Sequence, residues 1–592
     1  MNNNSDHLWL KKAEILSWEK KPKIALKRKQ NNYFTWFEDG KINAAYNCLE
    51  KNLNAKLHNK DAIIFISSDK KIIKISYEEL KNAVDNFCYF LKSKKLHKIN
   101  SVLIHSSASL EACISMLAFS KLGIHFSVVF EELEVEALKV RCDILKPNLI
   151  ISRSNDKILI NKFRFINKNI IKFINFSNNF SNLKNVINYE IDLNYFKDFP
   201  YSFFPGDRKF FSLFTSGSTG IPKGVTHKVA GYLLYAKLTS KNQFGMKENS
   251  IILTASDAGW INGHTYSLFG PLANGSTTII LEKPTLILNK EIFDKIVKDL
   301  KATIIYLPVT LIRMLKAINP KLKFSHHSLK CLGTMGEPLS PKIANWFRKI
   351  FSKKLNIINT YFQTETSGII YSHKYNDKEI YYEDGSCGKP VNKFLKIIKP
   401  EKEHKKFELK LKHIWPGCLS GIINSNDQYQ KYWDKNGNFC LFDFGSISKK
   451  KNLFVYGRID DVLNIRGHRL GSAEVESVII KLGYIREVCA ISTPDTIEGE
   501  KIVLFLSLSK IIDKNIIEHD INKMLINYFG SFAIPKNIFI LNELPKTRSG
   551  KILRRLLRNM YNFPNKKIGD VSTIMNLDTL KDAKKKLNEQ HE

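Results

Sequence analysis

The sequence lacks any closely spaced cysteine pair. Its nine cysteines are an odd number, are scattered through 592 residues and include no CxxC motif. Disulfide-stapled secreted proteins and cysteine zinc sites both need paired cysteines, so both classes are disfavoured. The expected location is a reducing compartment, the cytoplasm.

Long apolar segments are also missing. The amino terminus, MNNNSDHLWLKK, has no apolar stretch of the kind that a secretory signal peptide requires. The most apolar region, Ser101–Phe130, is interrupted by two histidines, a glutamate and a lysine, so it is not a membrane span. We expect neither a signal peptide nor a membrane partner.

Acidic residues are few relative to basic ones. Aspartate and glutamate total 57 against 92 lysines and arginines, which gives a formal net charge of +35. A nucleic-acid-binding protein can carry such charge, because clustered lysines release phosphate counterions. Here the lysines are spread along the whole chain, and Asn, Ile and Lys are abundant together, as A+T-rich coding would produce. We interpret the charge as a solvated surface and expect no nucleic-acid partner.

Short apolar runs alternate with amphipathic stretches over the first half of the chain. The runs predict buried strands at residues 62–66, 101–104, 149–151, 210–214, 251–255, 277–281 and 302–307. Helical patterns lie between several of them, as at 110–122 and 292–300. Alternating strands and helices indicate an α/β domain with a mostly parallel sheet, which binds ligands beyond the carboxyl ends of its strands.

A second, smaller unit is expected to begin near Arg458. Its helical patterns lie at 473–482 and 517–528, and strand-like segments lie at 487–492, 502–507 and 537–540. This mixture predicts a compact α+β domain over roughly the last quarter of the chain. The charged end, residues 581–592, predicts a loose helix or tail.

A segment rich in glycine and hydroxyl groups follows the expected strand at 210–214. It reads Thr215-Ser-Gly-Ser-Thr-Gly-Ile-Pro-Lys-Gly224, and a helical pattern begins at Val229. Glycines let backbone N–H groups approach an anion, hydroxyls donate hydrogen bonds, and Lys223 adds a positive charge. It is not a Walker loop, because Pro222 precedes the lysine and Gly224 follows it. The pattern predicts a phosphate-binding loop between a strand and a helix.

The segment 215–224 resembles the signature loop of the adenylate-forming superfamily, which includes acyl-CoA synthetases, luciferases and peptide-synthetase adenylation domains. Further segments are similar to the acetyl-CoA synthetase branch and its propionyl-CoA relatives. They follow the same order over nearly the whole chain: Trp36–Asn43, Asn47–Leu49, Ala258–Tyr266, Gly336–Pro338, Gln363–Thr366, Gly457–Asn464, Gly467–Leu470 and Leu544–Ile552.

The resemblance implies both an architecture and a reaction. The implied domains are an N-terminal extension (1–60), a large α/β domain with parallel-type sheets that binds ATP and the acid (61–459), and a small mobile α+β domain (460–592). In the first half-reaction a carboxylate attacks the α-phosphate of ATP, which yields acyl-adenylate and pyrophosphate. The thiol of coenzyme A then displaces AMP. Mg²⁺ is expected on the triphosphate.

The resemblance also assigns ATP contacts. The β- and γ-phosphates are assigned to Thr215, Ser216, Gly217, Ser218, Thr219, Gly220 and Lys223. The adenine wall is assigned to Gly336, Glu337 and Pro338, and further nucleotide contacts to Asn359 (where aspartate is usual), Thr360, Tyr361, Phe362 and Gln363. As catalytic residues, Thr364 is expected to meet the α-phosphate and Glu365 to bind the metal.

Further assignments fall in the second half of the chain. Asp443 matches the aspartate that binds ribose, since two hydroxyls can donate to one carboxylate. The usual Thr-Gly before it is Leu441-Phe442 here. Arg458 matches the arginine that contacts ribose and phosphate, and Arg469 is a further ATP contact. Asp460 matches the hinge about which the small domain rotates between the half-reactions.

Lys551 matches the adenylation lysine of the family. A flexible ammonium fits a step in which carboxylate and α-phosphate oxygens share one cation. Acetylation would remove its charge, so a lysine acetyltransferase and deacetylase are expected partners. Coenzyme A contacts are assigned to Gly467, His468 and Lys523; Ile526 occupies the place of an arginine near the 3′-phosphate, for which Lys523 could substitute.

The acyl pocket is assigned to Trp260, Ile261, Asn262, Met335 and Phe362. Acetate enzymes typically have tryptophan at the last position, so Phe362 keeps a smaller aromatic floor and indicates a short acid. Met335 takes back space where valine is typical. Asn262 stands where threonine or valine is usual; a buried amide needs hydrogen-bond partners, so it either reads a polar substituent or bonds only to backbone.

Together these features predict an AMP-forming acetate–CoA ligase that uses ATP, Mg²⁺ and coenzyme A. Propionate or a small polar-substituted acid is the alternative, because one methylene is worth only about 1–3 kcal/mol in a pocket. The complete N-terminal extension disfavours an enzyme that loads a carrier protein. A nonenzymatic basic homologue is disfavoured because all of the central site residues are present: Lys223, Glu365, Asp443, Arg458 and Lys551.

Overall fold

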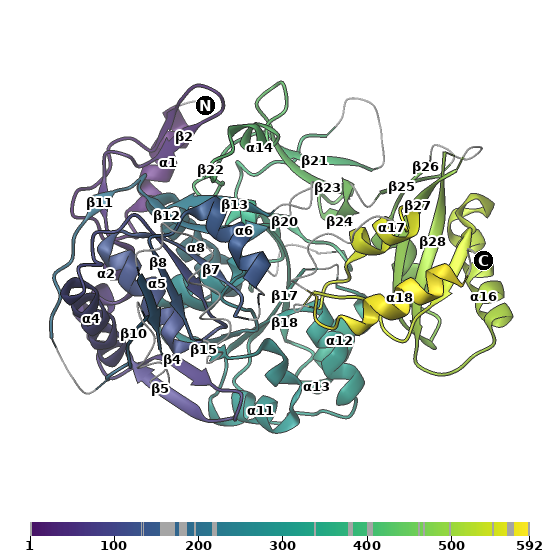
Figure 1. Ribbon diagram of the computed structural model, residues 1–592, viewed down its shortest axis with the longest axis horizontal. Coiled ribbons are helices and arrows are strands. Elements are labelled where there is room, and N and C mark those ends of the chain that lie inside the picture. Colours follow the sequence, from purple (N-terminus) through teal and green to yellow (C-terminus); the bar gives the residue numbers. More distant parts are fainter. Residues whose placement is uncertain are drawn as a thin grey trace. The chain divides into compact units, whose positions relative to one another are not determined.

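The structure is a computed structural model (Figure 1). It describes residues 3–131, 133, 135–153, 172–176, 186–193, 197–215, 222–336, 339–376, 383–399, 406–459, 462–465, 468–495, 499–547, 550–564 and 574–589. The chain forms two compact units. The larger comprises residues 1–396 and 412–439, and the smaller comprises residues 397–411 and 440–592.

An eight-stranded sheet of the larger unit carries the phosphate-loop segment at one end. Its strand order is β10-β9-β8-β6-β7-β12-β13-β22; the strands from β10 to β12 run parallel and the last two antiparallel. The apolar strands β6 and β8 are buried at every residue, as expected where helices cover both faces of a parallel sheet. The bounds are β6 Ser101–His105, β7 His125–Val129, β8 Leu149–Ser152, β9 Lys172–Asn175, β10 Val186–Asn188, β12 Lys209–Thr215, β13 Lys223–Lys228 and β22 Gly421–Ile422.

A nine-stranded sheet forms the other half of the larger unit. Its order is β20-β19-β18-β17-β16-β14-β15-β4-β5, with parallel pairing from β18 to β4 and antiparallel strands at both edges. Helices α12 and α13 pack on it through one apolar cluster. The bounds are β4 Asp61–Ile66, β5 Ile72–Ser76, β14 Ile251–Thr254, β15 Thr277–Leu281, β16 Ile304–Pro308, β17 Cys331–Met335, β18 Asn356–Tyr361, β19 Tyr371–Ser372 and β20 Lys389–Pro390.

The helices of the larger unit begin and end at local signals in the sequence. Ser76 and Glu79 form a capping box at the start of α4, and Gly123, with φ of +66°, ends α5. The bounds are α1 Asn3–Ala13, α2 Ala44–Cys48, α3 Glu50–Asn54, α4 Tyr77–Ser93, α5 Leu110–Leu122, α6 Val135–Leu145, α8 Val229–Phe244, α9 Ile261–His264, α10 Gly270–Ala273, α11 Lys290–Asp294, α12 Val309–Ile318, α13 Pro341–Ile350 and α14 Asn426–Gln430. Short strands complete the unit: β1 Leu26–Arg28, β2 Phe34–Trp36, β3 Lys41–Ile42 and β11 Phe204–Pro205.

The smaller unit contains a three-stranded sheet that is buried on both faces. Alternate residues of its two long strands belong to different apolar clusters, one shared with α15 and α16 and the other with α17 and α18. Its sheet strands are β27 Ile485–Asp495, β28 Gly499–Leu508 and β29 Asn537–Ile540. The helices are α15 Ser472–Ile479, α16 Lys514–Phe529, α17 Arg554–Asn562 and α18 Asp578–Asn588, and the remaining strands are β21 Phe407–Leu411, β23 Phe439–Ile447, β24 Leu453–Arg458, β25 Val462–Ile465 and β26 His468–Gly471.

The predicted fold class, a large α/β domain with parallel-type sheets and a smaller α+β domain, is confirmed. One predicted connection is wrong. The phosphate-loop segment does not lead directly into a helix, because β13 lies between it and α8 and pairs antiparallel with β12. Thr215 at the end of β12 is opposite Lys223 at the start of β13. The loop therefore closes a hairpin, and the N-terminus of α8 does not begin at it.

The charged end of the chain also differs from its prediction. Residues 578–588 form helix α18, whose Leu580, Ala583 and Leu587 are buried in the core of the smaller unit. Their spacing of three and four residues places the few apolar side chains on one stripe. The helix is therefore packed, although its composition is dominated by charge.

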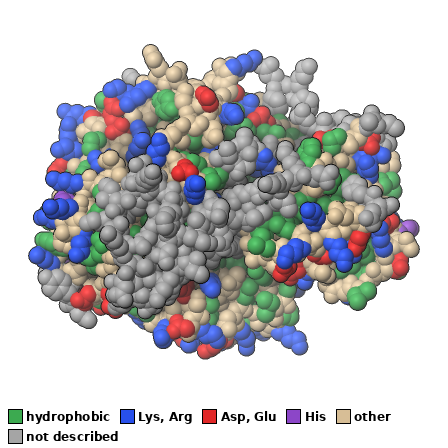
Figure 2. All heavy atoms as spheres, in the orientation of Figure 1, with side chains coloured by type: hydrophobic (Ala, Val, Ile, Leu, Met, Phe, Trp, Pro, Cys, Tyr) green, Lys and Arg blue, Asp and Glu red, His purple; other side chains and the backbone are tan. Residues whose placement is uncertain are grey.

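The surface agrees with a dispersed charge. Figure 2 shows Lys and Arg side chains scattered over the visible face instead of gathered in one patch. Among the residues that the structure describes, no helix combines the length and the apolar character needed to cross a membrane.

Buried histidines make the stability of the larger unit sensitive to acid. Burial lowers the pKa of His105, His125 and His227 to about 4, and that of His264 to about 3. An unfolded histidine titrates near pH 6.5, so between these values the unfolded chain binds more protons than the folded one. Stability is therefore fully present above about pH 6.5 and falls as the pH is lowered toward 4.

We expect the free energy of unfolding to fall between pH 7 and pH 5 by on the order of 1 kcal/mol for each of these histidines. The His264→Phe variant tests the cause, because the ring already packs against Phe211 and Phe126 with centroid distances of 4.5 and 6.0 Å. Urea unfolding at the two pH values should show a smaller loss in the variant. Equal losses in variant and wild type would rule His264 out as a contributor.

Candidate active site

Three side chains of the larger unit form a charged cluster beside the phosphate-loop segment. Lys223 begins β13, Glu365 lies in the short 3₁₀ helix Thr364–Thr366, and Tyr432 follows α14. The Lys223 Nζ lies 3.4 Å from Glu365 Oε1 and donates to the Tyr432 hydroxyl. That hydroxyl donates in turn to Glu365 Oε1 at 2.5 Å. The structure thus brings two predicted residues together and adds a third.

The sequence alone does not single out Tyr432 as a site residue. It lies 209 residues beyond Lys223, and the two are brought together because α14 packs near β22, which pairs with β13. The ring also lies under the ammonium, with Lys223 Nζ 4.6 Å from its centroid. The available signal was one tyrosine in the aromatic-rich stretch 429–433, and nothing local distinguishes it from a core aromatic.

The residues present fit a Mg²⁺ ion that is shared with a nucleotide. The Glu365 side chain is only 10% exposed, and the described residues contain no cluster of three or more His, Cys, Asp or Glu that could hold a metal ion by themselves. Mg²⁺ commonly binds one or two carboxylates together with substrate phosphates and waters. A single carboxylate beside a phosphate loop meets that requirement.

The turn that carries Thr364 and Glu365 is held from several sides. His227 on β13 donates from Nε2 to the Thr364 carbonyl at 2.9 Å, and burial lowers the pKa of His227 to about 4, which keeps the ring neutral at pH 7. The Leu419 N–H donates to the Glu365 carbonyl at 2.8 Å. Ser367 closes the turn with φ of +55°. This left-handed conformation is unfavourable for a residue with a side chain, so the turn is stabilised by its surroundings.

The side chains just before this turn form hydrogen bonds to other residues of the larger unit. Asn359 accepts from Thr334 Oγ1 at 2.9 Å and donates to the Ser386 carbonyl at 2.8 Å. Thr360 donates to the Thr334 carbonyl at 2.7 Å. Both residues fix the end of β18 next to β17. Tyr361 is also buried, whereas Phe362 and Gln363 are half-buried.

Gly336 lies at the carboxyl end of β17, where the resemblance assigns the adenine wall. Its φ is +87°, and a Cβ built on it would meet nothing within 4 Å. The backbone conformation, and not a lack of space, therefore requires glycine at this position. The two residues that follow, Glu337 and Pro338, lie outside the described residues.

The predicted acyl-pocket residues come from three elements of the nine-stranded half. Ile261 and Asn262 begin α9, Met335 ends β17 and Phe362 follows β18. The Asn262 Nδ2 lies 2.7 Å from Met335 Sδ, and Met335 shares an apolar cluster with Phe362. Trp260 packs its half-buried ring against Phe130, with a centroid distance of 5.2 Å.

Asp443 and Arg458 face each other in the smaller unit. They are opposite residues of β23 and β24, with 3.5 Å between Asp443 Oδ1 and Arg458 Nη1. The same guanidinium donates to the Leu441 carbonyl at 3.2 Å. Phe442, at the position where the family has glycine, keeps a φ of +54°. A phenylalanine in this left-handed conformation carries roughly 1–2 kcal/mol of strain next to the predicted ribose contact.

Lys551 ends a tight turn of the smaller unit. The Thr547 N–H donates to the Lys551 carbonyl at 2.8 Å, the Gly550 N–H donates to the Thr547 carbonyl at 2.8 Å, and the Lys551 N–H donates to Thr547 Oγ1 at 3.1 Å. Gly550 has a φ of +82°, which favours glycine. The Lys551 side chain is exposed on this fixed base.

The remaining predicted residues are only partly described. Ser216, Gly217, Ser218, Thr219, Gly220, Asp460 and Gly467 lie outside the described residues. His468 and Arg469 belong to β26, but their side chains are not described. Lys523 lies exposed on α16, as does Ile526 about one turn further on.

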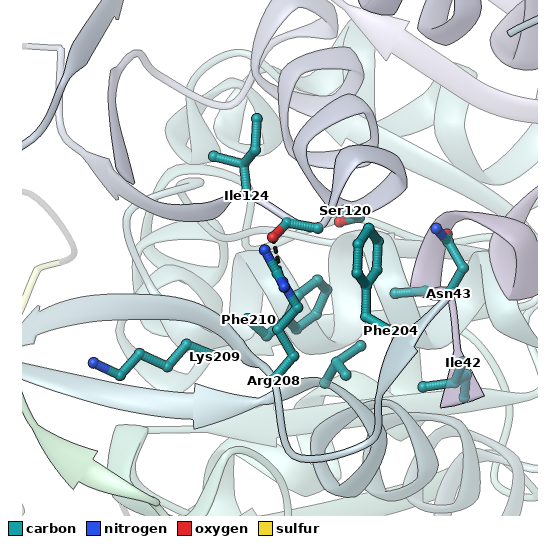
Figure 3. A pocket seen from close by; sticks show the side chains of 11 residues that line it. Ile42, Asn43, Ser120, Ile124, Phe204, Arg208, Lys209 and Phe210 are labelled. Atoms are coloured by element: carbon teal, nitrogen blue, oxygen red, sulfur yellow. Dashed lines mark hydrogen bonds between the residues drawn. The ribbon is translucent and has the colours of Figure 1, made fainter. Parts of the chain in front are cut away.

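One pocket of the larger unit lies apart from all predicted site residues. Figure 3 shows it between the amino-terminal segment 42–44, the end of α5 and the start of β12. Arg208 lies across it, stacks on Phe204 and donates from Nε to the Gly123 carbonyl at 2.6 Å. The Arg208 guanidinium is therefore engaged by Gly123 and Phe204 of the pocket wall.

Comparison with known protein families identifies the family of this chain. The family described as AMP-binding enzyme matches residues 49–407, and the AMP-binding enzyme C-terminal domain matches residues 474–551. The chain belongs to the AMP-binding enzyme family. A third family, described as acetyl-coenzyme A synthetase N-terminus, matches residues 1–48. Lys223, Glu365 and the pocket residues therefore lie in the region that matches the AMP-binding enzyme family, whereas Tyr432 lies beyond it. Lys551 is the last residue that matches the C-terminal domain family.

Curated relatives of this family share about a third of the sequence. The chain is 32% identical to acetyl-coenzyme A synthetase of Helicobacter pylori (strain P12) over 94% of this chain and 90% of that protein. It is 32% identical to acetyl-coenzyme A synthetase of Cupriavidus pinatubonensis over 97% and 93%.

Solved structures show the same fold at lower identity. An acetoacetyl-CoA synthetase from Streptomyces lividans superposes with a TM-score of 0.85 at 17% identity, covering 99% of this chain and 93% of that one. An anthranilate CoA ligase in complex with anthranoyl-AMP gives 0.76 at 20% identity, with 88% and 98% covered.

Proposed function

We propose that the protein is an AMP-forming acid–CoA ligase that activates acetate or another short carboxylic acid. The observation that carries the proposal is the pairing of Lys223 with Glu365 beside the phosphate-loop segment. An ammonium and a carboxylate at this place suit a nucleotide triphosphate with its metal. The similarity to acetyl-coenzyme A synthetases over nearly the full chain supports the ligase assignment.

In the first half-reaction, residues of the larger unit bind and orient ATP. Thr215–Gly220 and Lys223 hold the β- and γ-phosphates, Gly336–Pro338 line the adenine, and Thr364 meets the α-phosphate. Glu365 holds Mg²⁺, which when bound neutralises phosphate charge. The ion pair keeps both Lys223 and Glu365 oriented before ATP enters, so little reorganisation is needed.

In the smaller unit, Asp443 accepts hydrogen bonds from the ribose hydroxyls, and Arg458 with Arg469 contacts the nucleotide. The proposed functional boundaries are 1–60, 61–459 and 460–592, with Asp460 as the hinge between the half-reactions. Lys551 supplies the cation shared by the acid and the α-phosphate. Gly467, His468 and Lys523 contact coenzyme A.

Two further expectations belong with this function. Lys551 is exposed, as a substrate of a lysine acetyltransferase and deacetylase must be. All nine cysteines are buried, and no disulfide joins any of them, which suits a protein of the cytoplasm.

Acid-dependent exchange between ATP and pyrophosphate tests the function directly. With Mg²⁺ present we expect exchange with acetate or another acid of two to four carbons, and none without acid. When coenzyme A is added, the acyl-adenylate should react with it to give a thioester and AMP. The absence of exchange with every short acid would contradict the proposal, and exchange without thioester would restrict it to the adenylating half.

A further inference from the structure

The amide of Asn262 is buried with only one end engaged. The residue is 4% exposed, and its Nδ2 lies 2.7 Å from the Met335 sulfur. A thioether sulfur can accept a hydrogen bond weakly and can donate none, so it suits the NH₂ end of the amide. The oxygen, Oδ1, therefore points to the other side. Within the described part of the chain, no donor reaches it.

The neighbouring groups cannot satisfy this oxygen. Three of the other proposed pocket residues, Ile261, Met335 and Phe362, carry no side-chain donor. The fourth, Trp260, has an indole N–H, but its ring packs against Phe130 and does not donate to the Asn262 oxygen. The Tyr266 hydroxyl donates to Thr239 Oγ1 at 2.9 Å. The Thr265 hydroxyl donates to the Ser367 carbonyl at 2.6 Å.

A buried acceptor without a donor destabilises a protein, and most such groups in native structures have a partner. The residue that stands here is nevertheless an amide, although its surroundings would accommodate an apolar side chain of the same size. This combination is explained if the substrate brings the missing donor into the pocket.

We propose that Asn262 is a specificity-determining residue that accepts a hydrogen bond from a hydroxyl group on the acid, so that the preferred substrate is a short hydroxy acid. The inference rests on the proposed function and names the substrate class of that same site. A hydroxyl and a methyl group are similar in size, so Met335 and Phe362 would admit either. The pocket then distinguishes the two acids through Asn262 Oδ1. This oxygen accepts a hydrogen bond from the hydroxyl group of a hydroxy acid and has no partner when a methyl group stands in its place.

Matched acid pairs provide the test. Glycolate and propionate differ by hydroxyl against methyl, as do lactate and isobutyrate. In the wild-type protein we expect kcat/KM for glycolate to exceed that for propionate by at least about tenfold. In the Asn262→Leu variant, which keeps the size of the side chain and removes both polar atoms, the ratio should fall by at least about tenfold.

Ile261→Val is the matched control, because it changes the volume of the pocket and leaves its polarity intact. The glycolate-to-propionate ratio should then stay near the wild-type value. If Asn262 only supports Met335, Asn262→Leu would change both acids equally and leave the ratio unchanged, which would overturn the inference. Equal kcat/KM values for the two acids in the wild-type protein would overturn it without any variant.

These outcomes are separate from failure of the proposed function. Exchange with propionate or acetate but with no preference for hydroxy acids would remove the inference and leave the ligase in place. The absence of exchange with every acid would contradict both the inference and the proposed function.

Discussion

Replacing Lys551 with alanine is expected to reduce acid-dependent ATP–pyrophosphate exchange by about 10²–10³-fold, which is the usual effect of removing one group that stabilises transition-state charge. Two hydrogen bonds with Thr547 hold the backbone of this residue, while its side chain is exposed. The substitution therefore removes a charge and leaves the fold of the smaller unit intact. Thioester formation from supplied acyl-adenylate and coenzyme A should continue, because that half-reaction needs no cation at the α-phosphate.

The two half-reactions are measured separately, by exchange of labelled pyrophosphate and by release of AMP from synthetic acyl-adenylate. Lys536→Ala is the matched control, since it removes another exposed lysine of the same unit and should leave both rates unchanged. If Lys551→Ala lowers both half-reactions equally, the lysine does not act in adenylation alone. If both survive, the assignment is wrong.

The elements that the sequence predicts best are those with local signals. Strand β15 at 277–281, helix α5 at 110–122 and strand β29 at 537–540 have the expected bounds. The apolar runs of β15 and β29 are continuous, and α5 lies between Ser109, which caps it, and Gly123. Such signals depend on the residues of the element itself, so they can be read without knowing the fold.

The elements that the sequence did not predict depend on contacts with other elements. Strand β13 reads Lys-Gly-Val-Thr-His-Lys, a short polar stretch, and becomes a strand because β12 on one side and β22 on the other pair with it. The apolar residues of α18 are few, and only the sheet of the smaller unit determines that they are covered. Composition alone therefore does not predict that α18 is a packed helix.

The candidate site shows the same division. Motif order identified Lys223 and Glu365, which lie in contact, whereas Tyr432 could be found only from the fold. The family resemblance places Phe442 where glycine is usual, and the structure adds that the backbone there has the left-handed conformation. The phenylalanine therefore strains the backbone next to Asp443, although the backbone conformation is the one that glycine would favour.

Glu365→Gln is expected to lower acid-dependent exchange by about 10²–10³-fold, because it removes the charge that balances Lys223 and that would hold Mg²⁺ on the triphosphate. The side chain keeps its size, so the turn around Thr364 should stay in place through the bonds of His227 and Leu419 to its backbone. The variant should also need a higher Mg²⁺ concentration for half-maximal exchange. A Mg²⁺ titration of the exchange rate in both proteins measures the two effects together.

Tyr432→Phe is the matched control for this cluster. It removes the hydroxyl that accepts from Lys223 and donates to Glu365 Oε1 but leaves both charges, and a hydrogen bond to a charged group is worth about 1.5–3 kcal/mol. We therefore expect a loss of roughly ten- to a hundredfold at most, with the Mg²⁺ requirement near that of the wild type. Exchange retained within about tenfold in Glu365→Gln would contradict a metal role for the carboxylate. An equal loss in both variants would show that the hydrogen bond, and not the charge of Glu365, is what the reaction needs.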